Sequence, residues 1–235
     1  MAAVTVNGVR LAYELHGQGE PVVLLPGLGM VKEAWLAGPA PALANAGHQV
    51  VLVDNRGAGA SDAPAAPYTV ADLAVDTAGL IDQLGLAPCR LVGYSLGGFV
   101  AEHLAAERAN LVRAIALLGC AGPPTAYARL VIEAELEMAS QGLEPPQRKN
   151  IADLLGVLFP PAQLQVDALV EAWTTRLLAR PPWRNPGRHG QLAADHGWNQ
   201  GTRPCTPPGG RSSRCRCWRW RLSMMPASRR AAHGS

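Results

Sequence analysis

Short, fully apolar runs recur through the first 120 residues, and they constrain the fold more than any other feature of the chain. The runs lie at residues 21–25, 50–53, 91–92 and 114–118. Because successive side chains of a strand point to opposite faces, a run without a polar residue predicts a strand that is buried on both faces. Strands of that kind belong to parallel sheets covered by helices, so the runs predict an α/β fold.

The segments between these runs have helical features. The clearest begins at Thr69, where Asp72 three residues on completes a capping pair, and it ends at Gly85. Ahead of the first run, the Asn7-Gly8 pair separates two strand-like segments and predicts a hairpin. We therefore expect a mostly parallel sheet with helices on both faces.

The pentapeptide Gly93-Tyr94-Ser95-Leu96-Gly97 lies between a strand-like run and a helix-like segment. A strand that reverses sharply into a helix holds the central residue in a strained backbone, and glycines are needed beside it because a Cβ there would collide with neighbouring chain. The helix N-terminus favours a developing negative charge near the Ser95 oxygen. The motif predicts that Ser95 is a catalytic nucleophile. The alternative is an ordinary turn in a chain rich in Ala and Gly.

Three motifs, in this order, resemble those of the α/β-hydrolase superfamily. They are the loop at 24–30, the segment at 54–62 with the form D-x-R-G-x-G-x-S, and the Ser95 turn with the form G-x-S-x-G-G. Many members carry a His before the first Gly of the first loop, where this chain has Pro26. The resemblance implies an α/β-hydrolase core over residues 1–121.

The resemblance also implies an oxyanion hole. Its donors are the backbone N–H of Leu96, just after the nucleophile, and that of Leu28 in the first loop. Loss of one such donor typically costs about 3 kcal/mol of barrier. The alternative for Leu28 is that its loop merely turns the chain. Arg56 and Asp62 are expected to brace their own loop rather than touch substrate.

Residues 122–200 resemble the helical cap that many family members insert over the sheet. One helix is expected around Leu130–Met138 and a second from Ala162 to Leu178. The cap tryptophans are expected either to line a substrate pocket or to lie in a core: Trp173, Trp183 and Trp198. The acidic run is expected on a solvated face: Glu133, Glu135 and Glu137.

In this family an acid and then a His follow the cap and activate the serine. The sequence after the cap has no strand that ends in an acidic residue. His233 superficially suits the His position, but a chance match is the preferred interpretation. Asp195 and His196 precede the place of the family's acid, and we interpret them as surface residues.

The last 35 residues differ in composition from the rest of the chain. Residues 201–235 contain eight Arg and no Asp, Glu, Val or Ile, whereas residues 1–200 carry 13 basic and 18 acidic side chains. Such a composition is typical of disorder and predicts no buried strand, so the C-terminal strands of the fold are expected to be missing. The unpaired sheet edge that remains would favour self-association, and the oligomeric state stays open.

A reading-frame shift near residue 200 is one hypothesis for this tail. From Arg214 to Pro226, joining the third base of each codon to the first two of the next permits the string V-P-V-L-A-L-A-P-E-H-D-A. That string resembles the family's strand that ends in the catalytic acid. Its Asp is forced by the pair Met224-Met225, because Met has a single codon.

The rival hypothesis is that the tail is functional. Arg residues alternate with Trp and Cys between 214 and 221, a pattern that could bind nucleic acid or an anionic membrane. The three tail cysteines lack the spacing of a four-ligand zinc site. We favour the frame shift, and we expect no nucleic acid, membrane, metal or cofactor as a partner. Cys89 and Cys120, in apolar runs, are expected to be small buried residues.

The sequence thus predicts a hydrolase that acts on an ester, a lactone or a related small acyl substrate through an acyl-enzyme at Ser95. The alternatives are an inactive binding module of the same fold, a cofactor-free perhydrolase, and a carbon–carbon bond hydrolase. The N-terminus lacks a basic start followed by an apolar stretch, so a cytoplasmic location is expected.

Overall fold

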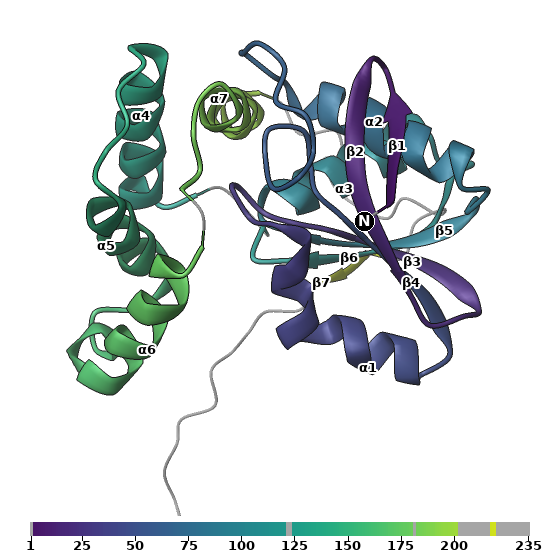
Figure 1. The fold of residues 1–235 in the computed structure, drawn as a ribbon, viewed down its shortest axis with the longest axis horizontal. Coiled ribbons are helices and arrows are strands. Elements are labelled where there is room, and N and C mark those ends of the chain that lie inside the picture. The colour runs from purple at the N-terminus through teal and green to yellow at the C-terminus, as the bar shows by residue number, and fades with distance from the viewer. Residues whose placement is uncertain (1, 121–123, 181, 202–216, 220–235) are drawn as a thin grey trace, which may run out of the picture.

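The computed structural model describes residues 2–120, 124–180, 182–201 and 217–219. Its centre is a seven-stranded sheet with the strand order β1-β2-β4-β3-β5-β6-β7 (Figure 1). The strands are β1 (Ala2–Val6), β2 (Val9–His16), β3 (Glu20–Leu25), β4 (His48–Val53), β5 (Cys89–Tyr94), β6 (Val112–Leu118) and β7 (Cys217–Arg219). Strands β3 to β7 are parallel to one another, and β2 joins β4 and β1 antiparallel, which confirms the mostly parallel sheet.

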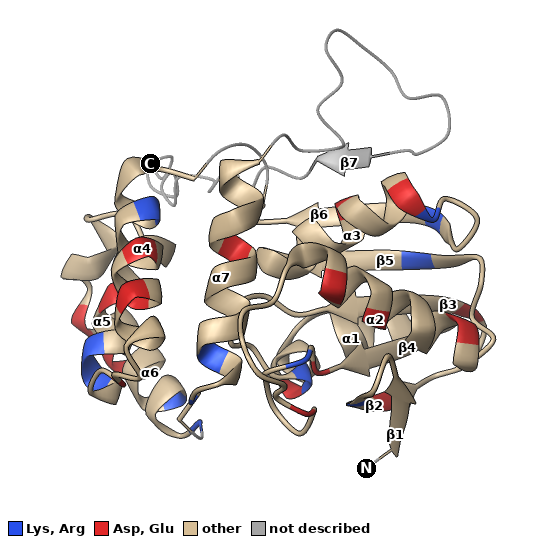
Figure 2. Cartoon of the chain, turned by 90° about the horizontal axis from the view of Figure 1, so that it is seen from above, with Lys and Arg blue, Asp and Glu red and all other residues tan. Residues whose placement is uncertain are grey.

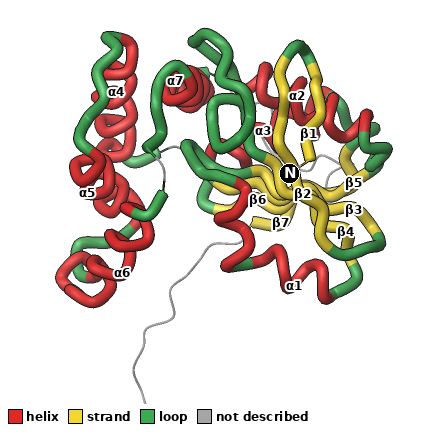
Figure 3. Tube along the Cα trace, in the orientation of Figure 1, coloured by secondary structure: helices red, strands yellow, loops and turns green. Residues whose placement is uncertain are grey.

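Helices follow most of the parallel strands (Figure 3). They are η1 (Lys32–Ala37), α1 (Pro39–Asn45), α2 (Val70–Gln83), α3 (Leu96–Glu107), α4 (Ala126–Ser140), α5 (Gln147–Leu158), η2 (Gln163–Gln165), α6 (Asp167–Leu178) and α7 (Gly187–Gln200). Helix α2 begins as predicted, since the Thr69 side chain accepts from the Asp72 N–H and the Asp72 side chain accepts from the Thr69 N–H. None of the described helices is long and apolar enough to cross a membrane.

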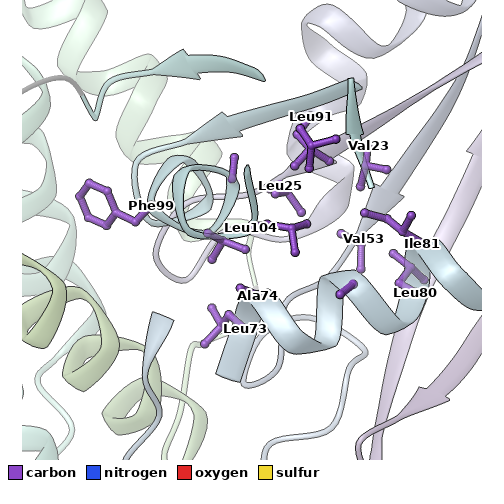
Figure 4. Packing of buried hydrophobic residues seen from close by; sticks show 14 of the residues in the cluster. Val23, Leu25, Val53, Leu73, Ala74, Leu80, Ile81, Leu91, Phe99 and Leu104 are labelled. Atoms are coloured by element: carbon purple, nitrogen blue, oxygen red, sulfur yellow. The ribbon is translucent and has the colours of Figure 1, made fainter. Parts of the chain in front are cut away.

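The apolar runs of β3 and β4 are buried on both faces of the sheet, as their composition predicts, whereas the runs of β5 and β6 are only partly buried on one face. In β3, Val23 and Leu25 face a core shared with α2 and α3, whereas Val22 and Leu24 face a second core shared with η1 and α1. Figure 4 shows the first core, where Leu80 and other α2 residues point at the sheet. Cys89 and Cys120 are buried, and burial raises the pKa of the Cys89 thiol to about 11. Both are therefore core residues, as expected.

The cap region differs in detail from the prediction. Its helix α6 starts at Asp167 rather than Ala162, because residues 163–165 form the separate short helix η2. Helix α5 was not predicted. Helices α4, α5 and α6 stand to one side of the sheet, and α7 lies between them and the sheet (Figures 1 and 2). Ala194 of α7 belongs to the core that the sheet shares with α2 and α3.

Helix α7 is joined to α4 by a buried ion pair. The guanidinium of Arg188, whose side chain is 1% exposed, donates to Glu135 at 3.0 Å. The expectation that Glu135 lies on a solvated face is therefore wrong, because α7 covers that side of α4. Glu133 of the same run is exposed.

Replacement of Glu135 is expected to destabilise the protein strongly. Glu135→Ala leaves the Arg188 charge buried without its partner, and such a change typically costs about 3–5 kcal/mol of unfolding free energy. Urea unfolding of the variant measures the loss. Glu133→Ala on the same helix is the matched control, with an expected change within about 0.5 kcal/mol. Equal effects of the two substitutions would contradict this account.

Strand β7 adds a short paired segment from the tail to the sheet. Residues 217–219 pair in parallel with Ile115, Ala116 and Leu117 of β6, so the sheet extends beyond β6. Such pairing along a sheet edge uses backbone N–H and C=O groups that every non-proline residue has. The expectation that the tail builds no buried strand concerns its side chains, and it stays a prediction.

Candidate active site

Ser95 lies in the turn between β5 and α3, in a backbone conformation that non-glycine residues rarely adopt. Its φ is 49° and its ψ is −120°. Backbone hydrogen bonds hold it there: its N–H donates to Leu118 O at 2.9 Å, and its carbonyl accepts from Gly98 N–H at 2.8 Å. The Ser95 side chain makes no capping hydrogen bond to α3. The strand–turn–helix arrangement predicted for the pentapeptide is therefore present.

The flanking glycines are required by close packing. A Cβ on Gly93 would lie 2.3 Å from Gly97 O, and a Cβ on Gly97 would lie 2.1 Å from Leu25 O and 2.7 Å from Pro26 O. No side chain fits at distances so far below van der Waals contact. These positions bring the start of α3 directly against the end of β3.

Gly97→Ala is expected to destabilise the fold by about 3 kcal/mol or more, because two backbone carbonyls would have to move. The matched control is Gly197→Ala, a helical glycine of α7 with no atom within 4 Å of the added Cβ. That change should stabilise the protein by about 0.5–1 kcal/mol through the better helix propensity of Ala. Thermal unfolding distinguishes them, and a neutral Gly97→Ala would count against the close packing of α3 on the end of β3.

The loop after β3, residues 26–30 and called here the β3 loop, packs against the Ser95 turn. A Cβ on Gly27 would lie 2.9 Å from the Tyr94 ring and 3.2 Å from Tyr94 O. The loop closes on itself through a hydrogen bond from Met30 N–H to Gly27 O at 3.1 Å. The structure therefore brings Leu28 and Ser95, 67 residues apart in sequence, into neighbouring turns.

The two backbone N–H groups predicted to form the oxyanion hole occupy suitable positions in their elements. Leu96 is the first residue of α3, so its N–H has no acceptor within the helix. Leu28 is half-buried in the β3 loop and packs against the core around α3. Burial raises the pKa of Tyr94, whose ring packs on Gly27 of the β3 loop.

The segment at 54–62 forms a braced loop beside this site. The buried carboxylate of Asp54 accepts from the N–H groups of Lys32 at 2.7 Å and Ala60 at 3.0 Å. Arg56 makes a paired contact with Asp76 of α2 at 2.6 and 2.7 Å. The hydrogen bond to Asp76 raises the pKa of Arg56.

Asp62 holds the other end of this loop, since it accepts from Arg10 N–H at 2.9 Å. Both Arg56 and Asp62 therefore brace the loop, as expected.

Sequence reasoning did not identify Lys32, which is fully buried. Its ammonium lies 3.5 Å from carboxylate oxygens of Glu14 and Asp54 and also contacts Glu33. Burial alone would lower the pKa of Lys32. The hydrogen bond to Glu33 and the charges of Asp54 and Glu14 raise it by more than burial lowers it, so the net pKa is raised. Lys32 stays charged and ties η1 to the Asp54 loop.

Two residues from the end of the cap region also reach the β3 loop, and sequence reasoning missed one of them. Trp183 packs on Gly29, where an added Cβ would lie 2.7 Å from the indole, and its Nε1 donates to Gly57 O at 2.9 Å. The fully buried Gln191 accepts from Gly29 N–H at 2.9 Å. No sequence signal distinguished Gln191, because the buried side of α7 also carries the charged residues Arg188 and Asp195.

The other two cap tryptophans lie in packed clusters. Trp173 contacts Phe159 edge-on within the cap, and Trp198 stacks on Phe99 of α3 with ring centroids 5.9 Å apart. His103 contacts the Trp198 ring edge-on. These contacts favour the core alternative for Trp173 and Trp198, whereas Trp183 lies against the β3 loop.

The acidic and histidine residues considered as partners of Ser95 differ in burial, and one of them lies outside the described residues. Asp195 is buried on α7 and accepts from the Asn199 side chain at 3.1 Å, so its interpretation as a surface residue is wrong. Its adjacent His196 is half-buried. His233 and the codon pair Met224-Met225 lie outside the described residues.

The fold and the Ser95 turn agree with the comparison to known families. A family model described as the alpha/beta hydrolase fold matches residues 20–147, more than half of the chain. The chain belongs to the α/β-hydrolase fold family. The resemblance inferred from the three sequence motifs is thus confirmed.

Several relatives within this family share sequence with the chain. BpoC of Mycobacterium tuberculosis, named as a non-heme bromoperoxidase, is 32% identical over 184 residues, which are 78% of this chain and 70% of BpoC. RutD of Variovorax paradoxus, named as a carbamate hydrolase, is 37% identical over 131 residues, 54% of this chain and 49% of RutD.

Solved structures give the same result. The BpoC crystal structure has a TM-score of 0.72 and covers 79% of this chain and 69% of its own. The enol-lactonase of Burkholderia xenovorans has a TM-score of 0.66 at 25% identity, and the match covers 84% of this chain and 73% of the enol-lactonase. At the level of class, these relatives identify the chain as a hydrolase of this fold.

Proposed function

We propose that the chain is a serine hydrolase by lineage, with Ser95 as the nucleophile that forms an acyl-enzyme. The observation that carries the proposal is the backbone of Ser95, with φ at 49° in a turn that neighbouring backbone hydrogen bonds hold. Strain of this size in a non-glycine residue persists where the surrounding structure fixes it, and it clusters at functional sites. A nucleophile presented in this way is the expected use of the turn.

The proposed oxyanion hole consists of the N–H groups of Leu96 and Leu28. In the reaction, the Ser95 oxygen attacks the acyl carbon, and the carbonyl oxygen gains the negative charge that these donors stabilise. Collapse of the tetrahedral intermediate breaks the bond to the leaving oxygen, which departs as the alcohol with the proton that the Ser95 hydroxyl gave up. Water then attacks the acyl-enzyme and releases the acid. The close packing of Gly97 on Leu25 and Pro26 supports this assignment, because it fixes the two turns against each other.

The proposed substrate is an ester, a lactone or a related small acyl compound. The named activities of RutD and of the Burkholderia enol-lactonase, a carbamate hydrolase and a lactonase, support this class. A panel of 4-nitrophenyl esters and γ-lactones, assayed with the purified chain, tests the proposal. Hydrolysis above the buffer rate is expected for at least one member of the panel.

A second candidate function is cofactor-free perhydrolysis, and the relationship to BpoC supports it. Hydrogen peroxide in place of water would attack the acyl-enzyme, release a peracid and restore the Ser95 hydroxyl. The peracid then oxidises bromide. Bromination of monochlorodimedone in acetate, peroxide and bromide measures this activity, and a rate unchanged by Ser95→Ala would rule it out.

We further propose that the tail from about residue 200 is read out of frame, so that Ser95 acts in this chain without the acid and the His and its hydrolysis is impaired. Strand β7 supports the proposal, because residues 217–219 pair beside β6 at the place where the shifted frame encodes an apolar strand. Sequencing of the gene across this region tests it. An uninterrupted frame that encodes the tail as printed would refute the shift.

A further inference from the structure

We infer that Gln191 is a positioning residue for the β3 loop, and that through it α7 links this loop to the cap. The inference rests on the proposed function, because it concerns the loop that carries the Leu28 donor. Gln191 has no proposed contact with substrate. Its inferred effect is to fix the direction in which the backbone N–H groups of the β3 loop point.

The Gln191 amide uses both of its polar ends in hydrogen bonds inside the protein. Its Oε1 accepts from Gly29 N–H at 2.9 Å, and its Nε2 donates to Arg56 O at 2.7 Å. A flipped amide would set donor against donor and acceptor against acceptor, so only one orientation fits. Because the side chain is fully buried, water cannot replace either bond without opening the site.

The bonds on either side of Leu28 fix the direction of its N–H. The Leu28 N–H and the Gly27 C=O belong to one planar peptide and point in opposite directions. Met30 N–H holds the Gly27 oxygen at 3.1 Å. Gln191 holds the next peptide through Gly29, whose φ of +62° no other residue adopts easily. Without Gln191 the N–H of the Leu28–Gly29 peptide loses its acceptor, which removes one restraint on the orientation of this peptide.

Helix α7 also contacts the cap helix α4, one helical turn before Gln191. Arg188 of α7 donates to Glu135 of α4 at 3.0 Å, and both partners are largely buried. Trp183, just ahead of α7, packs on Gly29. A shift of the cap that moves α7 therefore moves the acceptor of the Gly29 N–H. This arrangement makes the geometry of the β3 loop depend on the position of the cap.

The test uses two substitutions with different hydrogen-bonding capacity. Gln191→Met keeps the side-chain length and loses both bonds. Gln191→Glu, which burial holds in its protonated form, keeps an acceptor for Gly29 N–H and an O–H donor for Arg56 O. The first readout is amide hydrogen exchange at Gly29 by NMR, which does not depend on activity. The second is the rate constant for labelling of Ser95 by a fluorophosphonate. Gln200→Met, at the exposed end of α7, is the matched control.

Gln191→Met is expected to speed exchange at Gly29 and to slow labelling by about 10- to 100-fold, the effect of a small misplacement of a reacting group. Gln191→Glu is expected to keep Gly29 protected and to retain most of the labelling rate. The control is expected to match the wild type in both readouts.

Unchanged exchange at Gly29 in Gln191→Met overturns the inference, as does faster exchange with an unchanged labelling rate. If the wild type itself is not labelled, the proposed function fails, and exchange at Gly29 alone then decides whether Gln191 holds the loop.

Discussion

Ser95→Ala is expected to abolish hydrolysis of a small activated ester such as 4-nitrophenyl acetate. The variant keeps both proposed backbone donors but loses the oxygen that forms the acyl-enzyme. In a complete serine hydrolase, loss of the nucleophile costs about 10⁶ in kcat. In this chain the fold-loss cannot exceed the ratio of the wild-type rate to the uncatalysed rate. That ratio is expected to be smaller than 10⁶, because no acid and His are proposed to assist Ser95. Initial rates at equal protein concentration measure it.

The matched control for this substitution is Ser140→Ala, a serine at the exposed end of α4. It removes a hydroxyl far along the chain from the Ser95 turn and is expected to retain the wild-type rate. A Ser95→Ala variant that is as active as this control would mean that the measured hydrolysis arises elsewhere on the surface.

Correction of the reading frame ahead of codon 214 is expected to raise ester hydrolysis by about 10³-fold or more. The corrected chain, translated to its next stop codon, gains the Asp that the Met224-Met225 codons encode in the shifted frame. Loss of the acid alone from a complete triad lowers kcat about 3 × 10⁴-fold. Gain of the acid is therefore expected to have an effect of similar order, provided that the corrected frame also encodes the His. Steady-state rates of the two chains give the ratio.

Replacement of the new Asp by Asn in the corrected chain is the control, because it keeps the strand and removes the charge that orients the His. That variant is expected to lose most of the gain. A corrected chain that folds but is no faster than the present one would contradict the frame-shift proposal.

Local signals were sufficient to predict the sheet and the Ser95 turn. The apolar strands, the capping pair at Thr69 and the glycines beside Ser95 each depend on neighbours within a few residues of the chain. The braced loop at 54–62 was predicted from its family motif, although its bracing partners Arg10, Lys32 and Asp76 lie outside the motif.

The residues that sequence reasoning missed have roles that depend on contacts with distant parts of the chain. Gln191 bonds to Gly29 and Arg56, which lie 162 and 135 residues away. Glu135 and Asp195 are polar residues in helical patterns, and only the packing of α7 decides that they are buried. Helix α5 was missed because Pro146, interpreted only as the end of the preceding helix, is also the N-cap residue of α5.

Covalent labelling of Ser95 by a fluorophosphonate is the most direct test of the central claim, which is that this serine is the nucleophile of the chain. The purified chain is incubated with the probe, the mass of the intact protein is measured, and the adduct is mapped by peptide sequencing. We predict one adduct, on Ser95, that is absent from Ser95→Ala. A folded wild-type chain that gains no adduct, or carries it on another residue, would contradict the account.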